Sequence, residues 1–121
     1  MPVLETPIPG LFVFEPRVFT DDRGYFFESY NQSTWAEAGV NTVFVQDNQA
    51  RSTRGVLRGL HYQTGDKAQA KLVRVIEGEV LDVAVDLRPD SPTLGKWYTI
   101  LLSAENKRQL FVPRGFAHGY I

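Results

Sequence analysis

Two short clusters of polar residues stand out in an otherwise apolar sequence. His61 lies in the run RGLHYQ (residues 58–63), His118 lies in PRGFAH (residues 113–118), and Lys71 falls between them. An imidazole can act as a base near neutral pH, and an ammonium group can stabilise developing negative charge. The guanidinium of Arg58 is suited to bind an anionic group of a substrate. This set predicts proton abstraction beside a carbonyl, in a site without a metal.

Metal binding is the competing chemistry for two histidines. A first-row metal in a β-barrel takes three or four ligands, commonly His-x-His with a carboxylate and a further histidine. Here the residue two positions after His61 is Gln63, an amide and a poor ligand, and Lys71 falls where such barrels place the carboxylate. An ammonium at that position would repel a metal cation. The sequence therefore favours a pocket in which Lys71 supplies the positive charge.

Each of these residues also has a structural interpretation. A histidine on an alternating strand is often a satisfied core residue, and Lys71 could be an exposed lysine at the start of a strand. A partly buried Lys71 would need either a function or an acidic neighbour such as Asp82. If residues 56–62 and 71–76 form a hairpin, Lys71 lies beside His61.

Length and composition exclude several classes of protein. The 121 residues fit one domain, 1–121, with a core that needs no disulfide or metal. Lys and Arg number 13 against 14 Asp and Glu, so no overall charge favours nucleic acid or an anionic membrane. There is no cysteine, and no stretch approaches a membrane span or a signal peptide. We expect a cytoplasmic location, with no nucleic-acid or membrane partner.

Turn-forming residues recur at short intervals between runs rich in Val, Ile, Phe, Tyr and Leu, which predicts an all-β sandwich or barrel. One helix is expected over residues 32–38, with Asn31 or Ser33 as its N-cap and Gly39 as its stop. Residues 116–121 read as the start of an apolar strand that stops in mid-pattern, so we expect a piece of a longer protein. The clearest strands are expected over residues 11–14, 25–30, 43–49, 56–62, 71–76, 79–86, 98–103 and 109–112.

Five motifs, in order and spread over essentially the whole chain, resemble the dTDP-4-dehydrorhamnose 3,5-epimerase family. The resemblance implies a metal-independent cupin jelly roll (a double-stranded β-helix) that is a homodimer through its sheets and uses no cofactor. It also implies a dTDP-4-keto-6-deoxyhexose substrate and a chain that continues past Ile121. The motifs are RGYFFESYN (23–31), QDN (46–48), RGLHYQ (58–63), KLVRVIEGEVLDVAVDLR (71–88) and FVPRGFAHGY (111–120).

The resemblance implies roles for the catalytic residues. His61 matches the base and Lys71 the residue that stabilises the enolate oxygen. In the family the general acid is a tyrosine, and an aspartate orients the base; both lie beyond the position of Ile121. Tyr120 is not taken for the acid. We therefore expect the 121-residue chain alone to be impaired in catalysis.

The resemblance implies that the other matching residues bind the sugar nucleotide. By this resemblance Arg23 and Glu28 are expected to contact the nucleotide, in the family partly across the dimer interface. Arg58 is expected to bind the diphosphate, and His118 to belong to the substrate pocket. Phe26 is expected to offer a stacking surface for thymine, with packing in the core as the alternative. Contacts to the base and the sugar come from Gln46, Asp47 and Asn48.

The leading hypothesis is inversion of carbons 3 and 5 of dTDP-4-dehydro-6-deoxyglucose, in dTDP-L-rhamnose biosynthesis. A variant is a single-site epimerase or ketoisomerase acting on another dTDP-4-keto sugar. Two other classes stay open: a sugar-nucleotide-binding cupin without turnover, and a metal-dependent cupin oxygenase or isomerase. Solvent deuterium exchange separates the first class from the second, and metal analysis separates the third from both.

Overall fold

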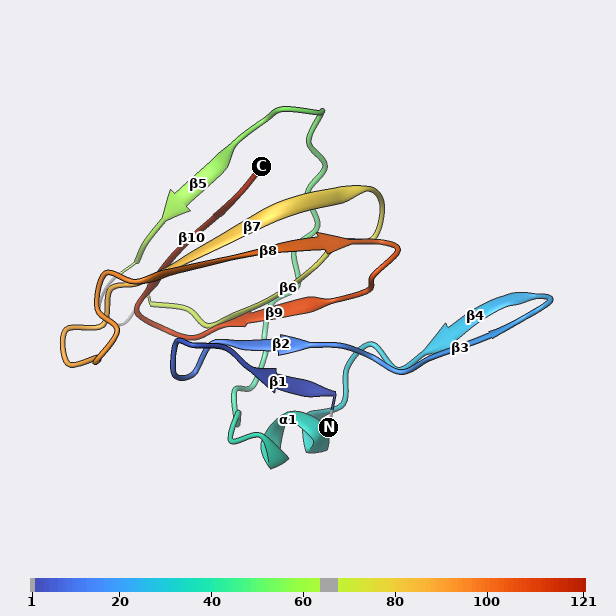
Figure 1. Ribbon diagram of the computed structural model, residues 1–121, viewed down its shortest axis with the longest axis horizontal. Coiled ribbons are helices and arrows are strands. Elements are labelled where there is room, and N and C mark those ends of the chain that lie inside the picture. The colour runs from blue at the N-terminus through green and yellow to red at the C-terminus, as the bar shows by residue number, and fades with distance from the viewer. Residues whose placement is uncertain (1, 64–67) are drawn as a thin grey trace.

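Two four-stranded antiparallel sheets face each other, and a two-stranded arm extends from them (Figure 1). The computed structural model describes residues 2–63 and 68–121. The first sheet has the order β1 (Val3–Glu5), β2 (Phe12–Phe14), β9 (Gln109–Val112) and β6 (Lys71–Arg74). The second sheet has the order β5 (Arg58–His61), β10 (Phe116–Tyr120), β7 (Glu79–Asp86) and β8 (Trp97–Ser103). The arm consists of β3 (Val18–Asp21) and β4 (Gly24–Phe27).

The main core lies between the two sheets. Side chains on a strand point alternately to its two faces, so every second residue of a strand points inward. In β9, Leu110 and Val112 belong to this inner core, while Phe111 packs on the opposite face of the sheet. All four residues of β9 are nevertheless buried, because the outer face of the first sheet is also covered. The inner core comprises Ile8, Leu11, Val13, Ala84, Ile100, Leu102, Leu110, Val112 and Phe116.

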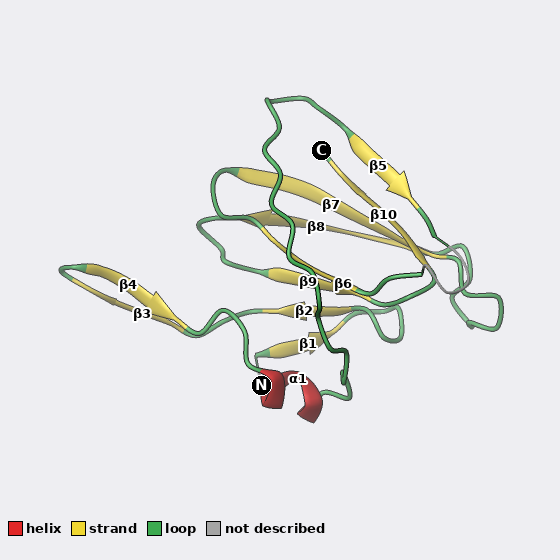
Figure 2. Ribbon diagram, turned by 180° about the vertical axis from the view of Figure 1, so that it is seen from behind, coloured by secondary structure: helices red, strands yellow, loops and turns green. Residues whose placement is uncertain are grey.

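The helix α1 (Gln32–Glu37) covers that outer face (Figure 2). Its N-cap is Asn31, whose side-chain oxygen accepts hydrogen bonds from the backbone N–H groups of Ser33 (2.9 Å) and Thr34 (3.4 Å). These bonds satisfy two of the amides that a helix start leaves without partners. Trp35 is buried between Phe14 and Phe111, with ring centroids 5.6 and 5.7 Å away. The helix therefore covers a second apolar cluster, and of the two predicted N-caps, Asn31 and Ser33, the structure confirms Asn31.

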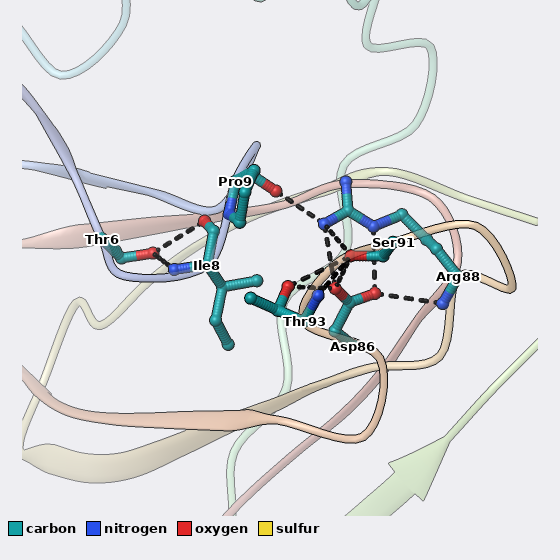
Figure 3. Close-up of polar contacts among 7 residues, drawn as sticks. All are labelled: Thr6, Ile8, Pro9, Asp86, Arg88, Ser91 and Thr93. Carbon is teal, nitrogen blue, oxygen red and sulfur yellow. Dashed lines mark hydrogen bonds and ion pairs between the residues drawn. The ribbon is translucent and has the colours of Figure 1, made fainter.

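A buried carboxylate joins two loops at one end of the sheets (Figure 3). Asp86 is fully buried and accepts hydrogen bonds from Arg88 (3.0 Å from Nε and from Nη2), from Ser91 and from Thr93 (2.6 Å). Arg88 Nη2 also donates to the carbonyl of Pro9 at 2.7 Å. Burial acts to raise the pKa of Asp86, but the bonds from Arg88, Ser91 and Thr93 outweigh it and hold that pKa well below its usual value. This cluster ties the loop after β7 to the loop between β1 and β2.

Most of the predicted elements are present, but two expectations are wrong and two short strands were not predicted. Residues 43–49 form no strand with a partner in the described part of the chain. The expected hairpin between 56–62 and 71–76 does not form, because β5 pairs with β10 and β6 with β9. Prediction also missed β1 and β3, which are only three and four residues long. The turn expected at residues 64–66 lies outside the described residues.

The arm formed by β3 and β4 projects away from the two sheets (Figure 1). It exposes aromatic side chains, including Tyr25 and Phe26, and Phe26 is 71% exposed. Lys107, in the turn after β8, lies over the Tyr25 ring with its Nζ 4.2 Å from the ring centroid. Gln109 of β9 donates a 2.8 Å hydrogen bond to the carbonyl of Ser29. The base of the arm is thus bonded to the first sheet through Gln109, while β3 and β4 pair with neither sheet.

Candidate active site

Two histidines lie side by side on the inner face of the second sheet. His118 of β10 is paired with His61 of β5 on one side and with Ala84 of β7 on the other. Directly opposed residues of neighbouring strands point to the same face, and Ala84 belongs to the inner core. His61 is exposed, whereas His118 is 6% exposed. The sheet therefore presents an accessible imidazole beside a buried one.

Lys71 reaches this region from the other sheet. It is paired with Val112, a core residue, so Lys71 also lies on the inner face of its sheet. His61 and Lys71 both line an open hollow of about 330 Å³, together with Tyr62, Gln63, Gln69, Gly115 and Phe116. A base and an ammonium group thus share one hollow, although they come from facing sheets and not from a hairpin.

Asp82, which the sequence offered as one possible acidic neighbour of Lys71, bonds His118 instead, with His118 Nε2 2.7 Å from Asp82 Oδ1. Asp82 is fully buried, and its other oxygen, Oδ2, has no hydrogen-bond partner among the described residues. Within the same described part of the chain, no carboxylate forms an ion pair with Lys71. Spacing along the chain does not reveal this partner, because it arises from the pairing of strands β7 and β10.

The Asp82–His118 pair is the feature of the site that sequence reasoning missed. A signal was present: Asp82 alternates with Val80 and Ala84 on the buried face of β7, where the only other charged residue is Asp86 at the end of the strand. A carboxylate at such a position requires a buried donor, because an unpaired buried charge is costly. The register that supplies the donor, Tyr120 opposite Asp82 and His118 opposite Ala84, appears only in the folded chain.

Gly115 and Phe116, which line the hollow, contact the loop that follows β7 and contains Arg88, the partner of Asp86. The guanidinium of Arg88 lies 4.8 Å from the centroid of the Phe116 ring, and Leu87 N–H donates to the Gly115 carbonyl at 3.0 Å. Gly115 has φ +88°, and a β-carbon there would lie 2.6 Å from Arg88 Cγ. Glycine is therefore required at this turn by both backbone conformation and space. The Asp86 cluster thereby helps to shape the candidate site.

Arg58 begins β5 at the open edge of the second sheet. Its position is paired with Tyr120 of β10, and its side chain is exposed. The guanidinium donates from Nε to Ser52 Oγ at 2.6 Å and from Nη2 to the carbonyl of Arg51 at 3.3 Å. Arg58 is thus on the same strand as His61, three residues away.

The residues expected to contact the base and sugar lie in an extended segment. Gln46, Asp47 and Asn48 are all exposed. Gln46 Nε2 donates to Asn48 Oδ1 at 3.2 Å. Their side chains are open to solvent, and no strand of the described residues pairs with this segment.

The structure does not bring the residues of the arm to the histidines. Arg23 and Phe26 line a separate hollow of about 400 Å³ on the arm, and Glu28 follows β4. The Arg23 side chain donates to Asp21, with Nη2 2.7 Å from Oδ2, and this bond lowers the pKa of the Asp21 carboxyl group. Because Phe26 is largely exposed, its alternative interpretation as a core residue is wrong. One copy of the chain therefore holds the expected nucleotide contacts in two separate places.

No group of three or more His, Cys, Asp or Glu side chains that could hold a metal ion occurs in residues 2–63 and 68–121. Over the same residues, no helix is long and apolar enough to cross a membrane.

Two facing four-stranded antiparallel sheets, with His61, His118 and Lys71 on their inner faces, are the arrangement of a cupin-like all-β protein, and the solved structures that match this chain confirm the predicted fold. Comparison with known proteins goes further. The family model for dTDP-4-dehydrorhamnose 3,5-epimerase matches residues 5–121. The chain belongs to this family.

Individual relatives agree with this assignment. The dTDP-4-dehydrorhamnose 3,5-epimerase of Shigella flexneri is 60% identical over 121 residues, which is 99% of this chain and 67% of the relative. The crystal structure of the Elizabethkingia anophelis enzyme of the same name superimposes with a TM-score of 0.94 at 57% identity, covering 98% of this chain and 66% of that one.

A Legionella pneumophila dTDP-6-deoxy-D-glucose-3,5-epimerase, solved in complex with dTDP-4-keto-L-rhamnose, gives a TM-score of 0.91 at 51% identity. The match covers 98% of the present chain and 63% of the Legionella chain. The present chain thus spans about two thirds of the length of the relatives that it matches.

Proposed function

We propose that the protein inverts carbons 3 and 5 of dTDP-4-dehydro-6-deoxyglucose, a reaction of dTDP-L-rhamnose biosynthesis. The observation that carries the proposal is the placement of His61 and Lys71 in one hollow, from facing sheets, with His118 beside His61. Membership of the epimerase family supports it.

The chemistry follows from the carbonyl at carbon 4 of the substrate, which acidifies the protons on carbons 3 and 5. The imidazole of His61 removes one of these protons, and the electron pair of the C–H bond moves into the ring to form an enolate. The ammonium group of Lys71 donates a hydrogen bond to the enolate oxygen and so stabilises its negative charge. Return of a proton to the opposite face completes the inversion. The family resemblance assigns that donor to a tyrosine in the part of the relatives that this chain does not span.

In this proposal Arg58 binds the diphosphate of the substrate, and Gln46, Asp47 and Asn48 contact the base and sugar. His61 and Arg58 are paired with His118 and Tyr120, which are two residues apart on β10, so both lie on the same face of the sheet and one bound molecule can reach both. The guanidinium carries a permanent positive charge and several N–H donors, which suits a diphosphate.

We further propose that the active form is a homodimer in which the arm of one copy reaches the site of the other. The outer face of the second sheet supports this proposal, because it carries exposed apolar residues: Trp97 is 70% exposed, and Leu81 and Leu101 are paired across β7 and β8. A second copy on this face would cover that apolar surface. Arg23, Phe26 and Glu28, which stand away from His61 in one copy, would then contact a nucleotide in the partner.

Mass spectrometry of the substrate after incubation in heavy water tests the activity. With the protein at its full natural length, we expect deuterium at carbons 3 and 5, at the same rate with and without a metal chelator; the 121-residue chain alone should exchange poorly. Exchange at only one carbon would identify a single-site epimerase. Binding of dTDP without any deuterium exchange would identify a sugar-nucleotide-binding protein without turnover. Loss of exchange when the chelator is added would indicate a metal-dependent reaction.

A further inference from the structure

The loop before β5 folds back on Arg58. The backbone N–H of Val56 donates to the carbonyl of Thr53 at 3.2 Å, and Gly55 within this turn has φ +86°. The turn brings Ser52 close to a residue six positions later, so that Ser52 Oγ accepts the hydrogen bond from Arg58 Nε at 2.6 Å. The carbonyl of Arg51 accepts a second bond, from Nη2, at 3.3 Å.

These two bonds leave one edge of the guanidinium free for a ligand. A guanidinium has five N–H donors in one plane. Ser52 and Arg51 take two of them, one on Nε and one on Nη2. The remaining three N–H groups are on Nη1 and Nη2, the pair that forms the end-on fork of an arginine. An anion bound by that fork approaches along the axis of the side chain.

We propose that Ser52 is a positioning residue for the sugar nucleotide: its hydroxyl holds the Arg58 guanidinium so that the two terminal nitrogens face the diphosphate. Arg58 is exposed and a free arginine has many rotamers, so a fixed acceptor at Nε lowers the entropy lost when the diphosphate binds. This inference rests on the proposed function, because it takes Arg58 as the diphosphate ligand.

The test is calorimetric binding of dTDP and of thymidine to the protein at its full natural length. We expect Ser52→Ala to weaken dTDP binding by about 3- to 10-fold, the range for one hydrogen bond. Thymidine has no diphosphate, so its affinity should stay unchanged. Ser52→Thr keeps the hydroxyl and should restore dTDP binding. Thr53→Ala is the matched control, because Thr53 is an exposed neighbour whose side chain makes no hydrogen bond within the described part of the chain.

A double variant separates this inference from the proposed function. In an Arg58→Ala background, adding Ser52→Ala should have no further effect on dTDP affinity, because Ser52 acts through Arg58. An equal loss in both backgrounds, or loss of thymidine binding with Ser52→Ala, would overturn the positioning role. If Ser52→Ala binds dTDP as tightly as the wild type while Arg58→Ala binds it more weakly, the positioning role of Ser52 is refuted and the diphosphate role of Arg58 stands. Unchanged affinity in Arg58→Ala would refute the diphosphate role of Arg58, and the role of Ser52 with it.

Discussion

Asp82 and His118 lie on neighbouring strands, β7 and β10, and His118 Nε2 lies within hydrogen-bond distance, 2.7 Å, of an oxygen of the fully buried Asp82. An ionised carboxylate only accepts hydrogen bonds, so with Asp82 ionised the ring donates from Nε2, and in the neutral imidazole Nδ1 is then the acceptor. The hydrogen bond also fixes the ring orientation on the strand that is paired with His61. The candidate base thus has an oriented imidazole as its neighbour.

The first prediction concerns the stability of this buried pair. Asp82→Ala should lower the free energy of unfolding by about 1–3 kcal/mol, because it leaves a buried imidazole N–H without its acceptor. Urea unfolding measures the change. Glu79→Gln is the control, since Glu79 is exposed on the same strand and should change stability little. A stability loss no greater than that of Glu79→Gln would show that the pair contributes nothing.

The second prediction concerns His61 as the base. In the protein at its full natural length, His61→Ala should lower deuterium exchange at both carbons by about 10²–10⁴-fold, because one base serves both positions. Affinity for dTDP should stay unchanged, since His61 is not expected to bind the nucleotide. Mass spectrometry reports the exchange and calorimetry the binding. Wild-type exchange at either carbon would remove His61 from this role at that carbon.

The third prediction tests whether the arm acts across a dimer. Arg23→Ala and His61→Ala should each be inactive at limiting substrate, the first through weak nucleotide binding and the second through loss of the base. Mixed dimers made by co-refolding the two variants should regain exchange, because one of their two sites combines an intact His61 with an intact arm. Mixtures of folded variants that have not exchanged subunits provide the background rate. If the arm serves its own subunit, co-refolding will give no gain.

The fourth prediction is the pH dependence of stability due to Asp86. Its pKa is lower in the folded chain than in the unfolded chain, so the unfolded state binds more protons in acid. The contribution of Asp86 to the free energy of unfolding is therefore complete above the pKa of Asp in the unfolded chain, about 4. It is lost as the pH falls from there toward the lower pKa of Asp86 in the folded chain.

Asp86→Asn should accordingly lower the free energy of unfolding at pH 7 by about 3 kcal/mol, because it breaks a buried, charged pair. The difference from wild type should shrink below about pH 4, where the wild-type carboxylate also becomes protonated on unfolding. Urea unfolding of the wild type and the variant, from about pH 7 down to about pH 2.5, measures the difference in unfolding free energy and its decrease in acid. Asp90→Asn, an exposed carboxylate of the same loop, is the control. A difference that stays constant across this range would contradict the assignment.

Local pattern alone determined much of this protein. Alternation and composition are properties of short segments, and they predicted the bounds of β7 and β9 and the all-β class correctly. Capping preference narrowed the helix start to Asn31 or Ser33, of which the structure has Asn31. Alternation and composition failed for residues 43–49, where β-forming residues have no described strand to pair with. A strand needs a partner for its backbone groups, and no local pattern supplies that information.

Tertiary structure alone decided which polar groups meet. His61 and Lys71 were both singled out from the sequence, but it was the facing of two sheets that placed them in one hollow. Because β7 pairs with β10, the Asp82 carboxylate forms its hydrogen bond with His118 and not with Lys71. A buried charge needs a hydrogen-bond partner, and the strand register decides which donor is close enough. The separation of the arm from the histidines also arises only in the folded chain, because β3 and β4 pair with each other and with neither sheet.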